Sequence, residues 1–206
     1  VDARRDRGLA VDNAGHRVCA VVLAAGVSSR FGENKMLHRV DGQPMVRRPV
    51  RAALDASMGE VVVVVGHQAD SVTRALGTLA EHDRVRVVRN LRFAEGMSTS
   101  LQAGIRACRD RADAVMVLLG DMPAVDAELV RDVLDAYRQG ASLVAAPDLG
   151  RRTGHPVILS AQLFDQVDGL QGDRGAREIV RSRPDRTAVV PLADRSTQRD
   201  VDEPPP

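Results

Sequence analysis

Three uninterrupted apolar segments limit the folds that this 206-residue chain can adopt. They are residues 18–23, the segment Glu60–Val65 with its five consecutive valines, and the segment Ala114–Leu119. A strand with one face in water alternates polar and apolar residues, whereas these segments do not, so each predicts a strand buried on both faces. Strands of that kind occur in parallel sheets that helices cover on both sides.

The segments between these strands carry the spacing of amphipathic helices and of shorter strands. Helices are predicted near residues 44–54, where Pro49 must kink the helix or delay its start, and at 69–80, 97–108, 129–137 and 174–182. Strands are predicted at 85–88, 142–146, 156–159 and 187–192. The pattern predicts a single α/β domain over residues 17–206, Rossmann-like, with a mostly parallel sheet and helices on both faces. Residues 1–16 are charged and without periodicity, which predicts a disordered leader.

Composition excludes several classes of partner. The formal net charge of +1 gives no reason to expect nucleic acid or an anionic membrane, and 2% aromatic residues leave few platforms for base stacking. No apolar segment approaches the roughly 20 residues of a spanning helix, and no signal-peptide core is present at the start. Cys19 and Cys108 form no metal-binding spacing and no disulfide framework. We therefore expect a cytoplasmic protein.

The first apolar segment leads into small residues and then into two cations. Ala24-Ala25-Gly26-Val27-Ser28-Ser29 allows a ligand to approach the backbone closely, so that peptide N–H groups can bind anionic oxygens. Arg30 and Lys35 then add the positive charges that a polyphosphate needs. Because ligands of parallel α/β sheets bind at the carboxyl ends of the strands, this segment is predicted to bind nucleotide phosphates, with residues 90–100 and 120–123 as its neighbours.

Lys35 is the only lysine among the 29 Lys and Arg residues. Chance could leave one lysine in a chain so rich in arginine. The alternative is that the site needs a compact ammonium group rather than a planar guanidinium. The position of Lys35 within the glycine-containing loop favours a functional role.

The loop is neither a P-loop nor a Rossmann fingerprint, because Glu33 follows Gly32 and Gly26 has no glycine two residues later. The segment from Leu23 to Lys35 reads L-A-A-G-x-S-x-R-F-G-x-x-K. It resembles the signature of the molybdenum cofactor nucleotidyltransferases, and its LAAG form is similar to their cytidylyltransferase branch. The resemblance implies a nucleotidyltransferase fold. It also implies nucleotide binding by Leu23, Ala24, Ala25, Gly26, Ser28, Arg30, Lys35 and Ser100, with Arg30 and Lys35 acting catalytically on the triphosphate.

Asp121 directly follows a predicted buried strand, in Gly120-Asp121-Met122-Pro123. From spacing alone, Asp121 could begin a turn or bind Mg²⁺, since magnesium needs only one or two carboxylates beside substrate phosphates. The G-D-x-P segment resembles the metal-binding segment of the same family, which implies that Asp121 is catalytic and binds Mg²⁺. By the same resemblance Asp202, in Asp200-x-Asp202-Glu203-Pro204, is implied as a second metal carboxylate.

Three further segments have an ordinary structural interpretation and a functional one. Ser100 could belong to a serine-capped helix start, but the G-x-x-x-S-L match implies contact with base and ribose. The segments around His155 and around Asp173 and Arg177 could be a turn and a helix cap. However, G-H-P-V and L-x-G-D-x-G-A-R resemble the cytidylyltransferases, which implies that His155, Asp173 and Arg177 shape the pocket for the second substrate. His155 is a weak candidate acid or base, since phosphoryl transfer depends mainly on positioning.

The implied activity is transfer of CMP from CTP to molybdenum-bound molybdopterin with release of pyrophosphate, without a protein nucleophile. A molybdoenzyme would receive the product. Two alternatives stay open: a non-catalytic chaperone that binds the molybdenum cofactor, and a nucleotidyltransferase with another acceptor such as a sugar phosphate.

Overall fold

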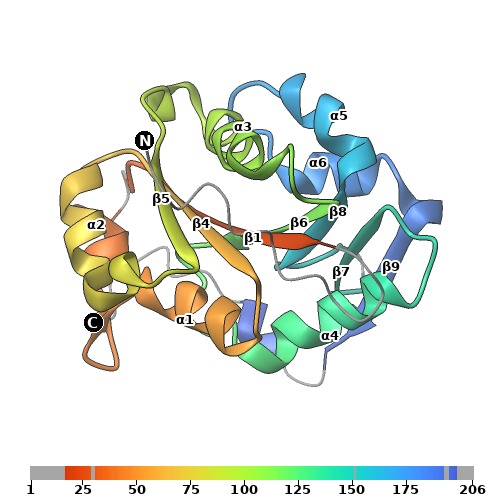
Figure 1. The fold of residues 1–206 in the computed structure, drawn as a ribbon, viewed down its shortest axis with the longest axis horizontal. Coiled ribbons are helices and arrows are strands. Elements are labelled where there is room, and N and C mark those ends of the chain that lie inside the picture. The colour runs from red at the N-terminus through yellow and green to blue at the C-terminus, as the bar shows by residue number, and fades with distance from the viewer. Residues whose placement is uncertain (1–16, 29–30, 151, 193–194, 199–206) are drawn as a thin grey trace.

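The computed structural model describes residues 17–28, 31–150, 152–192 and 195–198. Within them the chain forms one seven-stranded sheet with the order β5-β4-β1-β6-β8-β7-β9 and a separate two-stranded hairpin, β2-β3 (Figure 1). The strands are β1 Val18–Ala24, β2 Arg39–Val40, β3 Gln43–Pro44, β4 Glu60–Val65, β5 Val85–Arg89, β6 Ala114–Leu119, β7 Val144–Asp148, β8 Val157–Ser160 and β9 Thr187–Pro191. The α-helices are α1 Arg47–Asp55, α2 Ala69–Leu76, α3 Met97–Cys108, α4 Ala127–Arg138, α5 Phe164–Asp168 and α6 Ala176–Arg181.

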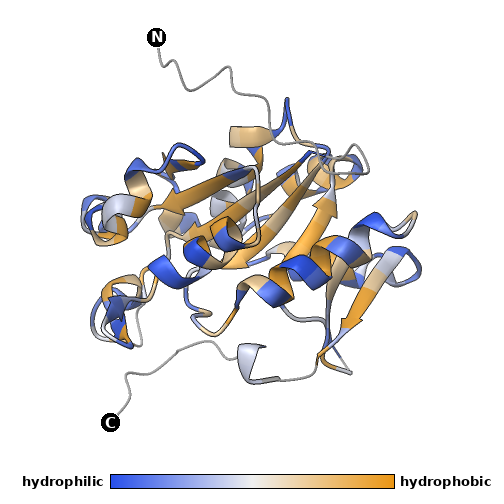
Figure 2. Cartoon of the chain, turned by 60° about the horizontal axis from the view of Figure 1, so that its bottom comes forward, coloured by the Kyte–Doolittle hydropathy of each residue, from blue (hydrophilic) through white to orange (hydrophobic). Residues whose placement is uncertain are grey.

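The sheet is buried on both faces, as its apolar strands predict. Alternate residues of β1 point to opposite faces of the sheet. Ala20 and Val22 pack in the cluster with α1, α2 and α4, whereas Cys19 and Val21 pack in the cluster with α3, α5 and α6. Apolar residues concentrate in the strands and the inner helix faces, and polar residues on the outer helix faces (Figure 2). The α/β fold with a mostly parallel sheet covered on both faces is thus confirmed.

Two helices show how local sequence sets their ends. Helix α4 begins where the Asp126 carboxylate accepts the Leu129 N–H at 2.9 Å, and its buried residues recur every three or four positions. Pro49 lies in the first turn of α1, where its missing N–H leaves no intrahelical bond unmade. The proline therefore delays the helix to Arg47, and Pro44, predicted to lie at its start, belongs to β3 of the β2–β3 hairpin instead.

Strands β5, β4, β1 and β6 are parallel, so their carboxyl ends meet at one edge. Strand β8 runs antiparallel to both β6 and β7. Residues 149–156 join β7 to β8 directly, a connection too short for the crossover that a parallel pair needs.

Helix α3 packs unusually close to the sheet. A Cβ at Gly104 would lie 2.3 Å from Cγ1 of Val21, so only glycine permits this approach. Helix α3 starts beside the carboxyl edge of the parallel strands and thus carries its N-terminal residues to the edge where ligands bind.

The predicted leader over residues 1–16 lies outside the described residues. No helix in the described part of the chain is both long enough and apolar enough to cross a bilayer.

Candidate functional site

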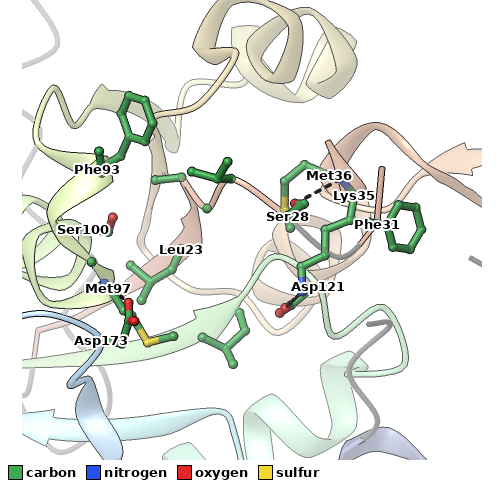
Figure 3. A pocket seen from close by; sticks show the side chains of 16 residues that line it. Leu23, Ser28, Phe31, Lys35, Met36, Phe93, Met97, Ser100, Asp121 and Asp173 are labelled. Carbon is green, nitrogen blue, oxygen red and sulfur yellow. Dashed lines mark hydrogen bonds and ion pairs between the residues drawn. The ribbon is translucent and has the colours of Figure 1, made fainter. Parts of the chain in front are cut away.

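A cavity of about 390 Å³ opens at the carboxyl edge of the parallel strands (Figure 3). The loop after β1, the N-terminal region of α3, the end of β6 and the loop before α6 supply its walls. Its lining residues are Leu23, Ala25, Gly26, Val27, Ser28, Phe31, Lys35, Met36, Phe93, Ala94, Gly96, Met97, Ser100, Leu119, Asp121 and Asp173. The sequence-based prediction that residues 23–35, 90–100 and 120–123 are neighbours is correct.

Lys35 and Asp121 form an ion pair at one end of this cavity. The Lys35 ammonium lies 2.5 Å from Oδ2 of Asp121, and the two side chains are 15% and 19% exposed. The close approach is possible because β1 and β6 are adjacent parallel strands, so the segments that follow them start side by side. The cavity thus contains one ammonium and one carboxylate in contact.

Ser28 closes the loop that carries Lys35. Its backbone has a φ of 56°, in the left-handed region, and its carbonyl accepts the Phe31 N–H at 2.9 Å. Its hydroxyl accepts the Lys35 N–H at 3.2 Å. The hydroxyl retains its own proton, which it can donate to a ligand oxygen in the cavity.

Two glycines let neighbouring segments approach the first strand. The Gly120 N–H donates to the Leu23 carbonyl at 2.9 Å, and a Cβ at Gly120 would lie 2.6 Å from the Met36 sulfur. A Cβ at Gly66 would lie 2.8 Å from that of Ala25. These contacts hold the loop that follows β1 between the ends of β4 and β6.

Ser100 lies at the opposite end of the cavity, near Met97 and Asp173 (Figure 3). It is buried, and its hydroxyl accepts a hydrogen bond from Nδ2 of Asn90 at 3.0 Å, a group that also donates to Thr99. Because Asn90 occupies an acceptor site of the Ser100 oxygen, the Ser100 proton is left for another acceptor. Asn90 was not predicted from sequence.

The loop before α6 is docked on the first turn of α3. The Gly172 carbonyl accepts the Ser98 N–H at 3.0 Å, and the Asp173 carboxylate lies 3.4 Å from the Met97 nitrogen. Gly96 has a φ of 110°, and a Cβ there would lie 2.3 Å from the Gly172 carbonyl carbon. A negative charge at a helix N-terminus is favourable, so this contact fixes the Asp173 carboxylate at the cavity wall.

Gln102 holds the chain just before this loop, at residues 167–170. Its amide nitrogen lies 3.2, 3.2 and 3.0 Å from the carbonyl oxygens of Val167, Asp168 and Leu170. Gln102 is 6% exposed, so its amide makes these contacts in the protein interior. Gln102 was also missed from sequence, because its partners lie far along the chain.

His155 does not line the cavity. Its backbone N–H donates to the Gln198 side chain at 2.8 Å, and its carbonyl accepts from the same amide at 2.7 Å. Burial, with a smaller contribution from the nearby Arg177 charge, lowers the pKa of His155 to about 4. The imidazole is therefore neutral near pH 7. His155 and Arg177 lie close enough to interact, yet neither is among the described cavity-lining residues.

The other predicted site residues divide into three groups. Leu23, Ala25 and Gly26 line the cavity as predicted. Ala24 points away from the cavity, into the core between the sheet and helices α1 and α4. Arg30 and Asp202 lie outside the described residues.

A divalent cation fits the site only if the substrate supplies most of its ligands. Among the described residues, no three His, Cys, Asp or Glu side chains are grouped closely enough to bind a metal by themselves. Asp121 nevertheless places a carboxylate in the cavity, and Mg²⁺ commonly takes one or two carboxylates together with substrate phosphates and water. The donor set is compatible with a metal that arrives with a nucleotide.

Comparisons with known proteins bear on this arrangement. A family profile described as a MobA-like NTP transferase domain matches residues 20–188. Nicotine blue oxidoreductase from Paenarthrobacter nicotinovorans is 32% identical over 193 residues, which cover 90% of this chain and 92% of that protein. The bifunctional protein GlmU of Anaeromyxobacter sp. strain K is 32% identical over 173 residues, 79% of this chain. That match spans only 35% of GlmU.

A solved structure shows the same fold at somewhat lower identity. A nucleotidyl transferase from Methanothermobacter thermautotroptrophicus superposes with a TM-score of 0.75 at 28% identity. The superposition covers 90% of this chain and 92% of that one. The likeness therefore extends over the sheet and its covering helices.

Proposed function

Since the chain belongs to the family of MobA-like NTP transferase domains, we propose that it is a nucleotidyltransferase that moves CMP from CTP to a phosphorylated acceptor. The acceptor that the sequence resemblance favours is molybdenum-bound molybdopterin, and the second product is pyrophosphate. One observation supports the proposal most strongly: Lys35 and Asp121 meet in a cavity at the carboxyl edge of the sheet.

In the proposed reaction a phosphate oxygen of the acceptor attacks the α-phosphorus of CTP. The bond from the α-phosphorus to the bridging oxygen breaks, and pyrophosphate leaves with that oxygen. No bond to the protein forms, so the chain contributes positioning and charge. The Lys35 ammonium stabilises negative charge on the phosphates, and the Ser28 hydroxyl and the loop N–H groups orient them.

Asp121 would hold Mg²⁺ in this scheme. A bound magnesium ion would neutralise charge on the phosphate oxygens that the ammonium does not reach. The metal needs no other described carboxylate, because phosphate and water oxygens complete its shell.

The two ends of the cavity suit different chemical groups. Lys35, Asp121 and Ser28 mark the phosphate end, and Ser100 with Asp173 marks an end that offers a hydroxyl donor and a carboxylate acceptor (Figure 3). Groups of those types recognise the hydroxyl and amino groups of a ribose, a base or a pterin. The reaction belongs in the cytoplasm, where buried free thiols such as Cys19 and Cys108 stay reduced.

The test uses purified protein with each of the four nucleoside triphosphates and molybdenum cofactor, with pyrophosphate release as the readout. We expect release only with cofactor, and fastest with CTP. Replacing the cofactor by a sugar 1-phosphate tests the acceptor class that the similarity to GlmU raises. Release with the sugar phosphate alone would overturn the molybdopterin acceptor, and cofactor binding without release would favour a non-catalytic chaperone.

A second candidate function is oxidation–reduction, because nicotine blue oxidoreductase matches this chain over nearly the full length of both. The cavity would then bind the nucleotide part of a redox cofactor rather than a triphosphate substrate. Oxidation of a reduced nicotinamide dinucleotide by a quinone or a redox dye, followed by absorbance, distinguishes the two. The Lys35–Asp121 pair favours the transferase, since a hydride transfer needs no metal carboxylate.

A further inference from the structure

Asn34 is a buried amide beside the nucleotide site, and both ends of its side chain are used. The residue is 2% exposed and does not line the cavity. Its Nδ2 donates to the His67 carbonyl at 3.1 Å, and its Oδ1 accepts the Met36 N–H at 3.1 Å. The second bond caps the short 3-10 helix Lys35–Leu37, so the lone lysine is the first residue of a capped turn.

The backbone of His67 connects both ends of the loop that follows β1. Its N–H donates to the Ala25 carbonyl at 3.1 Å, at the start of the loop, while its carbonyl accepts from Asn34 at the end. His67 itself comes directly after β4 and Gly66, in a position fixed by the parallel pairing of β1 with β4. The sheet thus sets the distance between the two ends of the loop.

The peptide groups around Lys35 are fixed as a consequence. The Lys35 N–H donates to the Ser28 hydroxyl, and the next N–H, that of Met36, donates to Asn34. The Met36 side chain is buried at 3% exposure, which anchors the chain on the far side. With its backbone held on both sides, Lys35 directs its ammonium toward Asp121.

From these contacts, and resting on the function proposed above, we infer that Asn34 is the positioning residue for Lys35. The amide suits this role because it offers a donor to one peptide carbonyl and an acceptor to one peptide N–H. Aspartate would keep the cap but place a carboxylate oxygen against the His67 carbonyl. Serine would keep the cap but is too short to reach His67 as well.

Because Lys35 is the only lysine, amine labelling reports on its ammonium directly. The protein is treated with a limiting acylating reagent, and peptide mapping separates the Lys35 product from that of the terminal amine. In wild type the ion pair and 15% exposure should keep acylation slow. We expect Asn34→Ser to raise the labelling rate by about 10-fold, since the ammonium leaves its pair with Asp121, and Asn34→Asp to raise it similarly. Unchanged labelling in both variants would overturn the inference.

A matched control separates positioning from stability. Ser160, the last residue of β8, is buried to a similar degree and caps the 3-10 helix Ala161–Leu163 by accepting the Gln162 N–H, far in sequence from the loop. Ser160→Ala should lower the Tm by an amount comparable to Asn34→Ser without changing Lys35 labelling. If Ser160→Ala accelerates labelling equally, general loosening of the fold explains the effect and the inference is wrong.

A double-mutant cycle tests whether Asn34 acts through Lys35. The affinity for Mg–CTP is measured by calorimetry in wild type, Asn34→Ser, Lys35→Ala and the double variant. We expect Asn34→Ser to weaken binding by about 10-fold in wild type and to have no further effect once Lys35 is alanine. Equal losses in both backgrounds would overturn the inference. Failure of wild type to bind any nucleotide would instead refute the proposed function, and the labelling result would still decide the role of Asn34.

Discussion

The Lys35 ammonium and the Asp121 carboxylate lie 2.5 Å apart although 86 positions separate them in the chain. Each neutralises the other in a pocket where both are mostly shielded from water. A nucleoside triphosphate that carries a divalent cation offers each group a new partner, phosphate oxygens for the ammonium and the cation for the carboxylate. In the proposed reaction, substrate binding would therefore replace this ion pair by two new interactions, and the effects of changing each residue can be predicted separately.

Asp121→Asn should preserve the fold and reduce turnover. The residue follows β6 at the cavity, outside the apolar core, and the amide has nearly the same shape as the carboxylate. Without the negative charge the site loses the carboxylate that is proposed to bind Mg²⁺, so we expect pyrophosphate release to fall by at least about 10²-fold. The measurement is turnover across a Mg²⁺ titration, with circular dichroism as the folding control. Normal turnover would mean that Asp121 is only a turn residue.

Gln102→Leu should affect the acceptor side of the cavity more than the nucleotide side. Removal of the amide takes a donor from the carbonyls of Asp168 and Leu170, which costs about 1–3 kcal/mol of stability, whereas the Val167 carbonyl still accepts the Leu170 N–H. The loop that presents Asp173 should also lose its support. We expect the KM for the acceptor to rise several-fold while the KM for CTP changes little. Arg109→Ala, which removes the ion pairs with Asp165 and Asp168 and a cation–π contact with Phe164 but leaves the Gln102 amide in place, is the control. Equal increases in both KM values would contradict this role.

The sheet could be predicted because burial on both faces leaves an unambiguous apolar pattern in β1, β4 and β6. Helix α5, Phe164–Asp168, could not, since five residues make little more than one turn and show no period. The antiparallel direction of β8 could not be predicted either, because the direction of a strand depends on the length and course of the connection before it, here residues 149–156, rather than on the strand residues.

The candidate site was predictable where the chemistry lies in contiguous sequence, as in the segment from Leu23 to Lys35. Asn34, Asn90 and Gln102 were missed for a common physical reason. Each is a buried amide whose function is to satisfy groups elsewhere in the fold, and no local spacing reveals such partners. Asn34 lies between two charged residues, Glu33 and Lys35, and only the structure shows that it is buried.

The stability of the fold should depend on pH through His155. Its pKa is about 4 in the folded protein, and its ordinary value is 6.5, so below pH 6.5 the unfolded chain binds a proton that the folded chain does not. Stability is therefore lost as the pH falls from 6.5 to 4, by up to about 3 kcal/mol. His155→Gln removes this contribution to the pH dependence of the free energy of unfolding. Urea unfolding at pH 7.5 and 4.5 should show a smaller drop for the variant than for wild type; parallel drops would contradict the assignment.

Ala25 should influence the choice of nucleotide. The LAAG segment resembles the cytidylyltransferase branch, which predicts CTP, and the Ala25 methyl group should crowd a purine base. The residue lines the cavity, and its Cβ also packs against Gly66, which has no space for a side chain of its own. We expect pyrophosphate release from CTP to exceed that from GTP, and Ala25→Gly to narrow the difference. Equal release from the two nucleotides by wild type would contradict the prediction.

Lys35→Arg tests whether the single lysine is an accident of composition, because every other basic position in the chain is arginine. A guanidinium keeps the charge and can still pair with Asp121, so the folded state should tolerate it and the Tm should be unchanged. Arginine is longer and planar, however, and the lysine is held by a backbone that Ser28 and Asn34 fix on both sides. The new group cannot retract to the position of the ammonium, so it should displace the phosphates by close to an ångström. Such a displacement lowers rates on the order of 10²-fold.

We therefore expect turnover of Lys35→Arg with CTP to fall by that factor, with CTP affinity reduced much less. Arg51→Lys, an exposed exchange on α1 remote in sequence from the loop, is the control and should leave both quantities unchanged. Wild-type kinetics in Lys35→Arg would mean that any cation suffices at this position, and the role of Lys35 would then reduce to its charge.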